Sequence, residues 1–167
     1  MRPAVLLVGV LLIGCGCLSF SDSADEWNSR GETHHTMGRY DEAVTAFDRA
    51  IAIDPGFEDA WKNRGLSLAL PNRTSESEES FVRAIAIDPD DAATFYYQAL
   101  ARNATGDRAG ALASIERGVA IAPMSRDDAI TLFSSLQFQG DLLSLEGRHE
   151  EADRSYARAH EVMQSTI

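Results

Sequence analysis

Apolar and small residues recur along this chain with the spacing of helices rather than of strands. Residues at positions i, i+4 and i+7 share one face of a helix, and four segments place mainly large apolar or small side chains there. These positions hold Trp27, Gly31, His34; Trp61, Gly65, Leu68; Phe95, Ala99, Arg102; and Leu136, Gly140, Leu143. Each segment is followed by a second one with Ala43, Phe47, Ala50; Ser77, Phe81, Ala84; Ala111, Ile115, Gly118; or Ala152, Tyr156, Ala159. The pattern predicts four antiparallel helix pairs in which a large side chain packs against small residues.

The pairs repeat with a period of thirty-four residues. The heptapeptide at 49–55 recurs letter for letter at 83–89, and a looser copy stands at 117–123. Each copy ends in a proline, which stops the second helix and turns the chain toward the next pair. The period predicts units at 24–57, 58–91 and 92–125, and a fourth unit shifted by seven residues to 133–166.

This period and its pattern of rings and small residues resemble the tetratricopeptide repeat. The resemblance implies an all-α helix–turn–helix solenoid of three regular repeats plus a fourth, shifted C-terminal repeat, acting as a protein-interaction module. The seven extra residues, 126–132, are expected to lengthen the first helix of the fourth repeat by two turns, with Ser125 as its cap. His34 and Arg102 depart from the apolar residues expected at inward positions, which predicts looser packing or partial exposure there.

The resemblance also implies a concave groove lined by the first helices, where a peptide or protein partner binds. The expected partner-groove residues are Asn28, Glu32, Lys62, Asn63, Leu66, Tyr96, Tyr97, Asn103, Gln137 and Asp141. Tyr96 and Tyr97 are the favoured contacts, because tyrosine offers a large area with few rotatable bonds. A solvated face with incidental tyrosines is the alternative.

One groove type of the family, the carboxylate clamp, uses lysine, asparagine and arginine at set positions. Here those positions hold Asn28, Glu32, Asn63, Ala93 and Tyr97, and only Asn63 agrees with the pattern. The sequence therefore argues against a groove that binds a carboxylate in this way.

The N-terminal segment has the features of an export signal. A basic start at Arg2 is followed by an unbroken apolar or glycine run from Ala4 to Ile13. Residues 12–15 (LIGC) resemble the lipobox of prokaryotic lipoproteins, which implies a signal peptide at 1–14, a lipid anchor on Cys15 and a tether to residue 23. We expect an exported protein held on the outer side of the cytoplasmic membrane or in the periplasm. An uncleaved signal-anchor is the alternative.

Charge and composition exclude several kinds of chemistry. Fifteen basic against 26 acidic residues give a formal charge of −11 in 167 residues, which disfavours a nucleic-acid partner. The two cysteines lie in the N-terminal apolar stretch, so the remainder offers no thiolate metal site. His34 and His35 are adjacent and point about 100° apart on a helix, so they do not chelate one ion together. No catalytic motif occurs, and neither a catalytic residue, a cofactor nor a bound metal is expected.

Two further hypotheses concern modification and function. Asn72 and Asn103 each begin an N-glycosylation acceptor pattern at the predicted turn between two helices. The sequence favours a membrane-anchored extracytoplasmic scaffold for protein–protein interaction. An accessory subunit of an envelope enzyme, a weak carbohydrate-binding module and a purely structural spacer are the alternatives.

Overall fold

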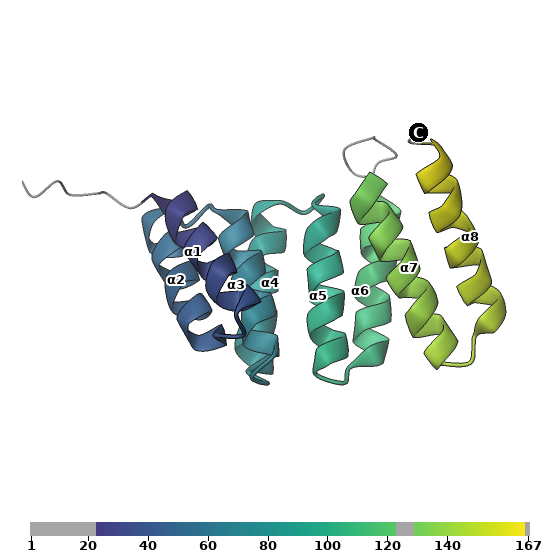
Figure 1. Cartoon of the computed structure of the whole chain (residues 1–167), viewed down its shortest axis with the longest axis horizontal. Coiled ribbons are helices and arrows are strands. Elements are labelled where there is room, and N and C mark those ends of the chain that lie inside the picture. Colours follow the sequence, from purple (N-terminus) through teal and green to yellow (C-terminus); the bar gives the residue numbers. More distant parts are fainter. Residues whose placement is uncertain (1–22, 123–128, 166–167) are drawn as a thin grey trace, which may run out of the picture.

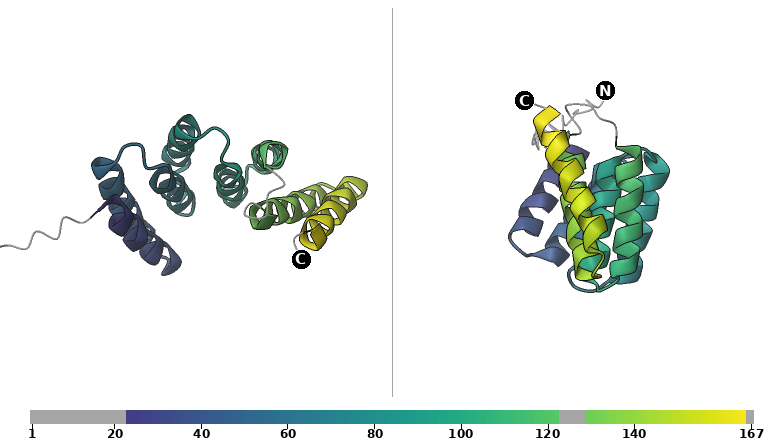
Figure 2. Two further views of the ribbon diagram at one scale, coloured as in Figure 1. Left: turned by 90° about the horizontal axis from the view of Figure 1, so that it is seen from above. Right: turned by 90° about the vertical axis from the view of Figure 1, so that its right-hand side faces the viewer.

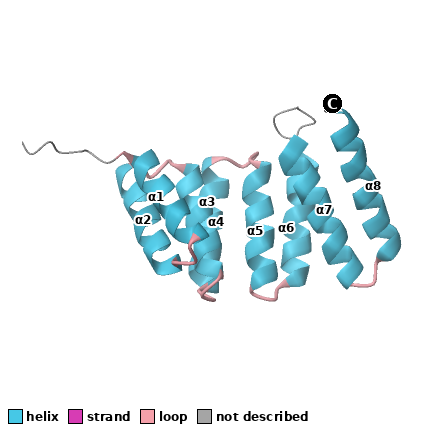
Figure 3. Cartoon of the chain, in the orientation of Figure 1, coloured by secondary structure: helices cyan, strands magenta, loops and turns pink. Residues whose placement is uncertain are grey.

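The computed structural model describes residues 23–122 and 129–165, and throughout these ranges the chain is helical, with turns and no strand (Figures 1 and 3). The helices are α1 (Ala24–Thr36), α2 (Tyr40–Ile53), α3 (Glu58–Ala69), α4 (Thr74–Ile87), α5 (Ala92–Ala104), α6 (Arg108–Ile121), α7 (Ala129–Leu145) and α8 (His149–Ser165). They form antiparallel pairs along the chain, α1 with α2 through α7 with α8. The predicted all-α helix–turn–helix solenoid is confirmed.

The pairs are arranged in an arc because the first helices pack on one another and the second helices do not. Helix α1 contacts α3, α3 contacts α5 and α5 contacts α7, whereas within the described residues α2, α4, α6 and α8 make no such contacts among themselves. Seen from above, α1, α3 and α5 lie along the inner side of the arc (Figure 2, left). The first helices therefore line the concave side, as the sequence predicts.

In the first, second and fourth pairs, an aromatic ring of the second helix occupies the space above a glycine of the first. Phe47 and Phe81 are fully buried, and their rings lie against Gly31 and Gly65. A Cβ added to Gly65 would lie 2.8 Å from Cε2 of Phe81. Tyr156 packs against Gly140 in the same way. The third pair differs, because a Cβ added to Gly118 of the second helix would lie 3.1 Å from Cβ of Phe95 and 3.2 Å from the Ala92 carbonyl oxygen.

A hydrogen bond between side chains joins the two helices of the second, third and fourth pairs at the same register. Arg64 donates to Ser80 at 2.6 Å. Ser114 donates to Gln98 at 3.0 Å, and Ser155 donates to Gln139 at 3.1 Å. Sixteen residues separate the partners in every case. These bonds satisfy side chains that the packing buries, since Ser80 and Ser114 are almost inaccessible to solvent.

The turn from first to second helix uses a left-handed residue at one register position. Gly38, Gly106 and Gly147 have φ of 72°, 87° and 77°, and Asn72 takes this conformation in the second pair with φ of 62°. Asparagine is one of the few side-chain-bearing residues that adopt it readily. Asn72 therefore closes a turn, and it is also exposed, as the predicted acceptor pattern requires.

The two unusual inward residues behave differently from each other. His34 is half-buried, and its Nδ1 is a buried atom without a hydrogen-bond partner in the described part of the chain. Arg102 is fully engaged: it donates from Nε and Nη2 to Glu78, at 2.7 Å each, and from Nη1 to Ser114 at 2.8 Å. Arg102 is partly exposed, which is one of the two expected alternatives, and a bidentate ion pair takes the place of an apolar contact.

Some of the predicted features lie outside the described residues. Helix α7 is described from Ala129, one turn before residue 133, while the rest of the predicted extension and Ser125 lie outside the described ranges. Cys15, the signal and most of the tether also lie outside them. Ser23 caps α1, since its Oγ accepts from the Glu26 N–H at 3.2 Å and its own N–H donates to the Glu26 carboxylate at 3.1 Å. Across residues 23–122 and 129–165, none of the helices combines the length and the apolar character that crossing a membrane requires.

Candidate functional site: a hollow on the concave side

A hollow of about 380 Å³ lies on the concave side of the first three pairs. Its walls come from the inner helices α1, α3 and α5, and its floor from Phe47 of α2. The lining residues are Glu32, His35, Thr36, Phe47, Asn63, Leu66 and Tyr97. Four of the ten predicted groove residues, Glu32, Asn63, Leu66 and Tyr97, meet there.

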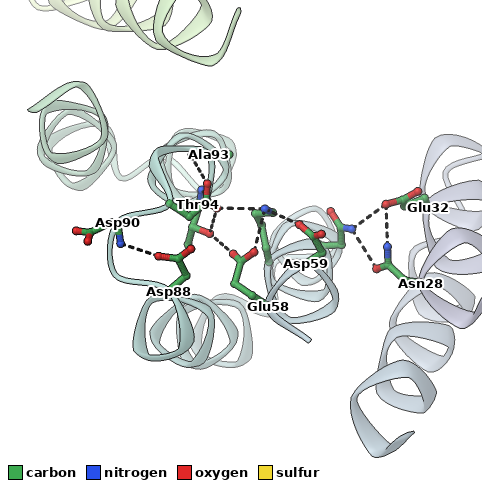
Figure 4. Close-up of polar contacts among 11 residues, drawn as sticks. Asn28, Glu32, Glu58, Asp59, Asp88, Asp90, Ala93 and Thr94 are labelled. Atoms are coloured by element: carbon green, nitrogen blue, oxygen red, sulfur yellow. Dashed lines mark hydrogen bonds and ion pairs between the residues drawn. The ribbon is translucent and has the colours of Figure 1, made fainter. Parts of the chain in front are cut away.

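Two amides hold the Glu32 carboxylate at the rim of this hollow (Figure 4). Oε1 of Glu32 accepts from Nδ2 of Asn28 at 3.0 Å and from Nδ2 of Asn63 at 3.1 Å. Asn63 also donates to Oδ1 of Asn28 at 3.2 Å. Asn28 is buried, so its predicted role in the groove is indirect: it orients Glu32. In the described ranges no cation pairs with Glu32, and both of its bonds use Oε1.

His35 adds a second acceptor to the same wall. Its Nδ1 lies 2.8 Å from Oγ of Ser67, and the Ser67 hydroxyl donates to the Asn63 carbonyl at 2.9 Å. Because the Ser67 hydroxyl donates to the Asn63 carbonyl, we assign the ring proton of His35 to Nδ1, and in this tautomer Nε2 is an acceptor. Burial lowers the pKa of His35 below its ordinary value, so the ring is neutral at pH 7.

Lys62 differs from the prediction that it would be a groove contact. The residue is only 7% exposed, and its ammonium is paired with three carboxylates. Nζ lies 2.7 Å from Asp59, 3.2 Å from Glu58 and 3.2 Å from Asp91. The prediction of Lys62 as a groove contact therefore needs correction: Lys62 joins α3 to the start of α5 and leaves no free positive charge for a partner.

The carboxylates of this cluster titrate differently because their surroundings differ. Burial raises the pKa of Glu58 above its ordinary value, although Thr94 and Lys62 act in the opposite direction. Burial would also raise the pKa of Asp91, but hydrogen bonds from Thr94 and the ammonium of Lys62 outweigh it, so this pKa is lowered. Burial similarly opposes the charge of Lys62, yet its three acidic neighbours raise its pKa. The cluster holds more negative than positive charge at pH 7.

The two tyrosines that the sequence favours have different surroundings. Tyr97 lines the hollow, and its ring centroid lies 5.9 Å from Nζ of Lys62. Tyr96 packs edge-on against Phe138 of α7 with ring centroids 6.2 Å apart, and it covers a core cluster shared by α5–α8. Tyr97 is thus available to a partner, whereas Tyr96 contributes to the packing between the third and fourth pairs.

The other predicted site residues lie away from the hollow. Gln137 and Asp141 are exposed on α7, and Asp141 accepts from the Tyr156 hydroxyl at 2.8 Å. Asn103, the second possible glycosylation site, is half-buried in the last turn of α5. The hollow therefore covers the first three pairs, and the structure does not bring the fourth into it.

Sequence analysis missed Thr36, the floor position of Phe47 and the acidic neighbours of Lys62. The spacing of Glu58 and Asp59 to Lys62 is the i+3 and i+4 spacing of helical ion pairs, so part of that cluster was detectable. Asp91 is 29 residues away and required the fold. Among the residues described, no cluster of His, Cys, Asp or Glu side chains is suited to hold a metal ion.

Comparisons with known proteins agree with this architecture. The sequence pattern described as "Tetratricopeptide repeat" matches residues 24–57. The fold is a tetratricopeptide-repeat solenoid. A crystal structure of MamA is similar, with a TM-score of 0.68 and 18% identity over 87% of this chain and 81% of that chain. MamA 41-end from Desulfovibrio magneticus RS-1 has a TM-score of 0.64 and 19% identity over 85% and 76%. No curated protein sequence matches the chain.

Proposed function

We propose that this solenoid is a non-catalytic scaffold that binds a peptide or protein segment in the hollow formed by α1, α3 and α5. The observation that supports this is the composition of the hollow: an apolar floor and wall of Phe47, Leu66 and Tyr97 beside the hydrogen-bonding groups of Glu32 and His35. An apolar side chain can be desolvated there while a neighbouring polar group is fixed in orientation.

We further propose that the scaffold is exported and held on a membrane by a lipid on Cys15. The apolar run, the LIGC motif and the short segment before Ser23 support this arrangement. The solenoid would then hold its partner close to the membrane surface.

Site-directed photocrosslinking in the native membrane tests the binding site. A crosslinking residue at Leu66 should capture a neighbour, whereas one at Val82, which is 60% exposed on α4 and outside the hollow, should not. Tyr97→Ala should reduce the yield at Leu66 by roughly 30-fold, because aromatic contacts in pockets are often worth ~2 kcal/mol or more. Equal capture from both positions, unaffected by Tyr97→Ala, would place the interface elsewhere.

Membrane fractionation tests the anchor separately. Cys15→Ala should move the protein from the membrane to the soluble fraction, and Cys17→Ala should leave it in place, because Cys17 has a glycine rather than an aliphatic residue three positions before it. Unchanged membrane association of Cys15→Ala would refute lipidation at this residue.

A further inference from the structure

The charge of the concave hollow is one-sided. Of its seven lining residues, Glu32 is charged and His35 is neutral, and none carries a positive charge. The nearby cation, Lys62, is surrounded by three carboxylates and is almost inaccessible to solvent. A partner therefore meets negative charge at this rim without a compensating positive group.

The hydrogen-bonding capacity of the rim is also one-sided. Asn28 and Asn63 each donate a hydrogen bond from Nδ2 to Oε1 of Glu32, which leaves Oε2 able to accept. His35 uses its Nδ1 proton on Ser67, which leaves Nε2 able to accept. Both unused groups are acceptors, and a partner must supply the donors.

An apolar surface adjoins these two acceptors. Leu66 and Tyr97 are half-buried and Phe47 forms the floor, so a side chain placed there would leave water on contact. The hollow thus offers one acceptor pair and one apolar contact side by side.

We infer that the occupant of the hollow is a peptide segment with an arginine or lysine next to a large apolar residue. The basic side chain donates to Oε2 of Glu32 and Nε2 of His35, and the apolar one packs on Leu66 and Tyr97. This inference rests on the proposed function and specifies its partner. In a carboxylate clamp the groove binds a carboxylate of the partner. Here Asn63 donates instead to Glu32, a carboxylate of the groove itself, and the partner is expected to carry the positive charge.

A selection from a displayed library of random twelve-residue peptides tests the inference. The targets are the full chain in mild detergent and its Glu32→Gln, Glu79→Gln and Tyr97→Ala variants. Glu32→Gln keeps the oxygen that accepts from both amides and removes the charge. Glu79 is exposed on α4 outside the hollow, so Glu79→Gln changes the net charge equally and controls for non-specific attraction to an acidic protein.

We expect the native chain and Glu79→Gln to select peptides enriched in arginine or lysine beside an apolar residue. Glu32→Gln should lose the enrichment in basic residues and bind the selected peptides about tenfold more weakly, as removal of a charged hydrogen-bond partner implies. The loss should shrink at about 1 M salt, where the screening length falls to ~3 Å. A defect that is only structural would not depend on salt in this way.

Two other outcomes have separate meanings. Peptides that depend on Tyr97 but are acidic, or whose basic enrichment survives Glu32→Gln, would overturn this inference and leave the proposed groove function standing. Selection that yields no peptide sensitive to Tyr97→Ala would overturn both.

Discussion

At the scale of single residues, the close packing of α4 on α3 depends on the absence of a side chain at Gly65. The fully buried Phe81 ring occupies the volume that a Cβ would need, with three ring carbons within 3.0 Å of that position. Glycine is a poor helix former, costing about 1 kcal/mol relative to alanine, so its place in mid-helix has a packing cause. The close approach of α3 and α4 outweighs the propensity.

Gly65→Ala should therefore destabilise the protein even though alanine favours helices. We expect a net loss of about 1–2 kcal/mol in the free energy of unfolding, because overpacking a core typically costs ~1–3 kcal/mol. Urea denaturation followed by circular dichroism measures it. Gly56→Ala is the control: its Cβ would meet only the Asp54 carboxylate at 3.3 Å, and we expect a change within about 0.5 kcal/mol. An unchanged or higher stability of Gly65→Ala would contradict the ring-over-glycine account.

The charge of Asp91 stabilises the folded chain because Thr94, Lys62 and two backbone N–H groups all donate to or pair with it. Its pKa is lowered on folding, so its contribution is present above the ordinary aspartate pKa and is lost as the pH falls through the lower, folded value. Glu58 has the opposite sign: its raised pKa means that its protonated form is favoured in the fold and that its charge opposes stability near neutral pH.

Asp91→Asn should lower the free energy of unfolding at pH 7 by about 1 kcal/mol, since a hydrogen bond to a charged group is worth ~1.5–3 kcal/mol and this one is half-exposed. Asparagine retains the helix cap, so the change isolates the charge. The difference from the native chain should narrow as the pH falls below about 4. Asp90→Asn, exposed on the same turn, is the control and should change the free energy of unfolding at pH 7 by less than ~0.5 kcal/mol. A gap that stays constant with pH would exclude the charge as its cause.

At the scale of elements, the junction between α4 and α5 is held differently from the other junctions. Packing between these helices is sparser than between α2 and α3 or between α6 and α7, and an open cleft of about 360 Å³ lies beside them. The bidentate pair of Arg102 and Glu78 crosses this junction, and Gln98 also donates to Glu78 at 3.1 Å. Polar contacts thus replace part of the apolar packing here.

A double-mutant cycle of Glu78→Gln and Arg102→Gln should show a coupling energy of about 1 kcal/mol, measured by chemical denaturation, because both side chains are partly removed from solvent. The pair of Arg148 and Glu151 has the same bidentate geometry but joins residues three apart in more exposed positions. Its cycle should give a smaller coupling energy, because solvent screens exposed charges. Equal couplings would show that bridging two repeats adds nothing.

At the scale of the whole molecule, stability accumulates because each pair completes the core of its neighbour. One hydrophobic cluster joins the third and fourth pairs, with Ala99, Ala111, Leu112 and Ile115 on one side and Leu142, Leu143 and Ala152 on the other. These residues lie on four helices, so neither pair buries the cluster alone.

A chain that ends at Ala122, without α7 and α8, should unfold at lower urea concentration and with a broader transition. Exposing even one leucine-sized side chain of the cluster costs about 1.5–3 kcal/mol, and the loss of neighbour contacts reduces cooperativity. Circular dichroism during urea titration measures both. Met163→Ala, at a residue of α8 that is 45% exposed, serves as the control and should change stability by less than ~0.5 kcal/mol. Unaltered unfolding of the shortened chain would contradict neighbour-dependent stability.

The repeat itself was predictable because its causes are local or periodic. The thirty-four-residue period, the rings opposite glycines and the prolines after the second helices are all visible in the chain, and residues such as Phe81 and Gly65 meet where that register places them. The inner side was predictable for the same reason, since Glu32, Asn63, Leu66 and Tyr97 share a helical face at repeat spacing. The left-handed turn position at Gly38, Asn72, Gly106 and Gly147 was present in the sequence but was overlooked.

What the tertiary structure alone decided is which polar groups remain free. Lys62 and Glu32 were both predicted as groove contacts, yet the ammonium of the first is buried and paired with carboxylates that include Asp91, while two amides hold the second at the rim. Tyr96 and Tyr97 are adjacent, but only contact with α7 shows that Tyr96 is used in packing. Helical periodicity fixes the direction in which a side chain points. The deciding partners, Asp91 for Lys62 and Phe138 for Tyr96, lie 29 and 42 residues away in the sequence. Electrostatic and solvation energies depend on such partners, so only the fold determines them.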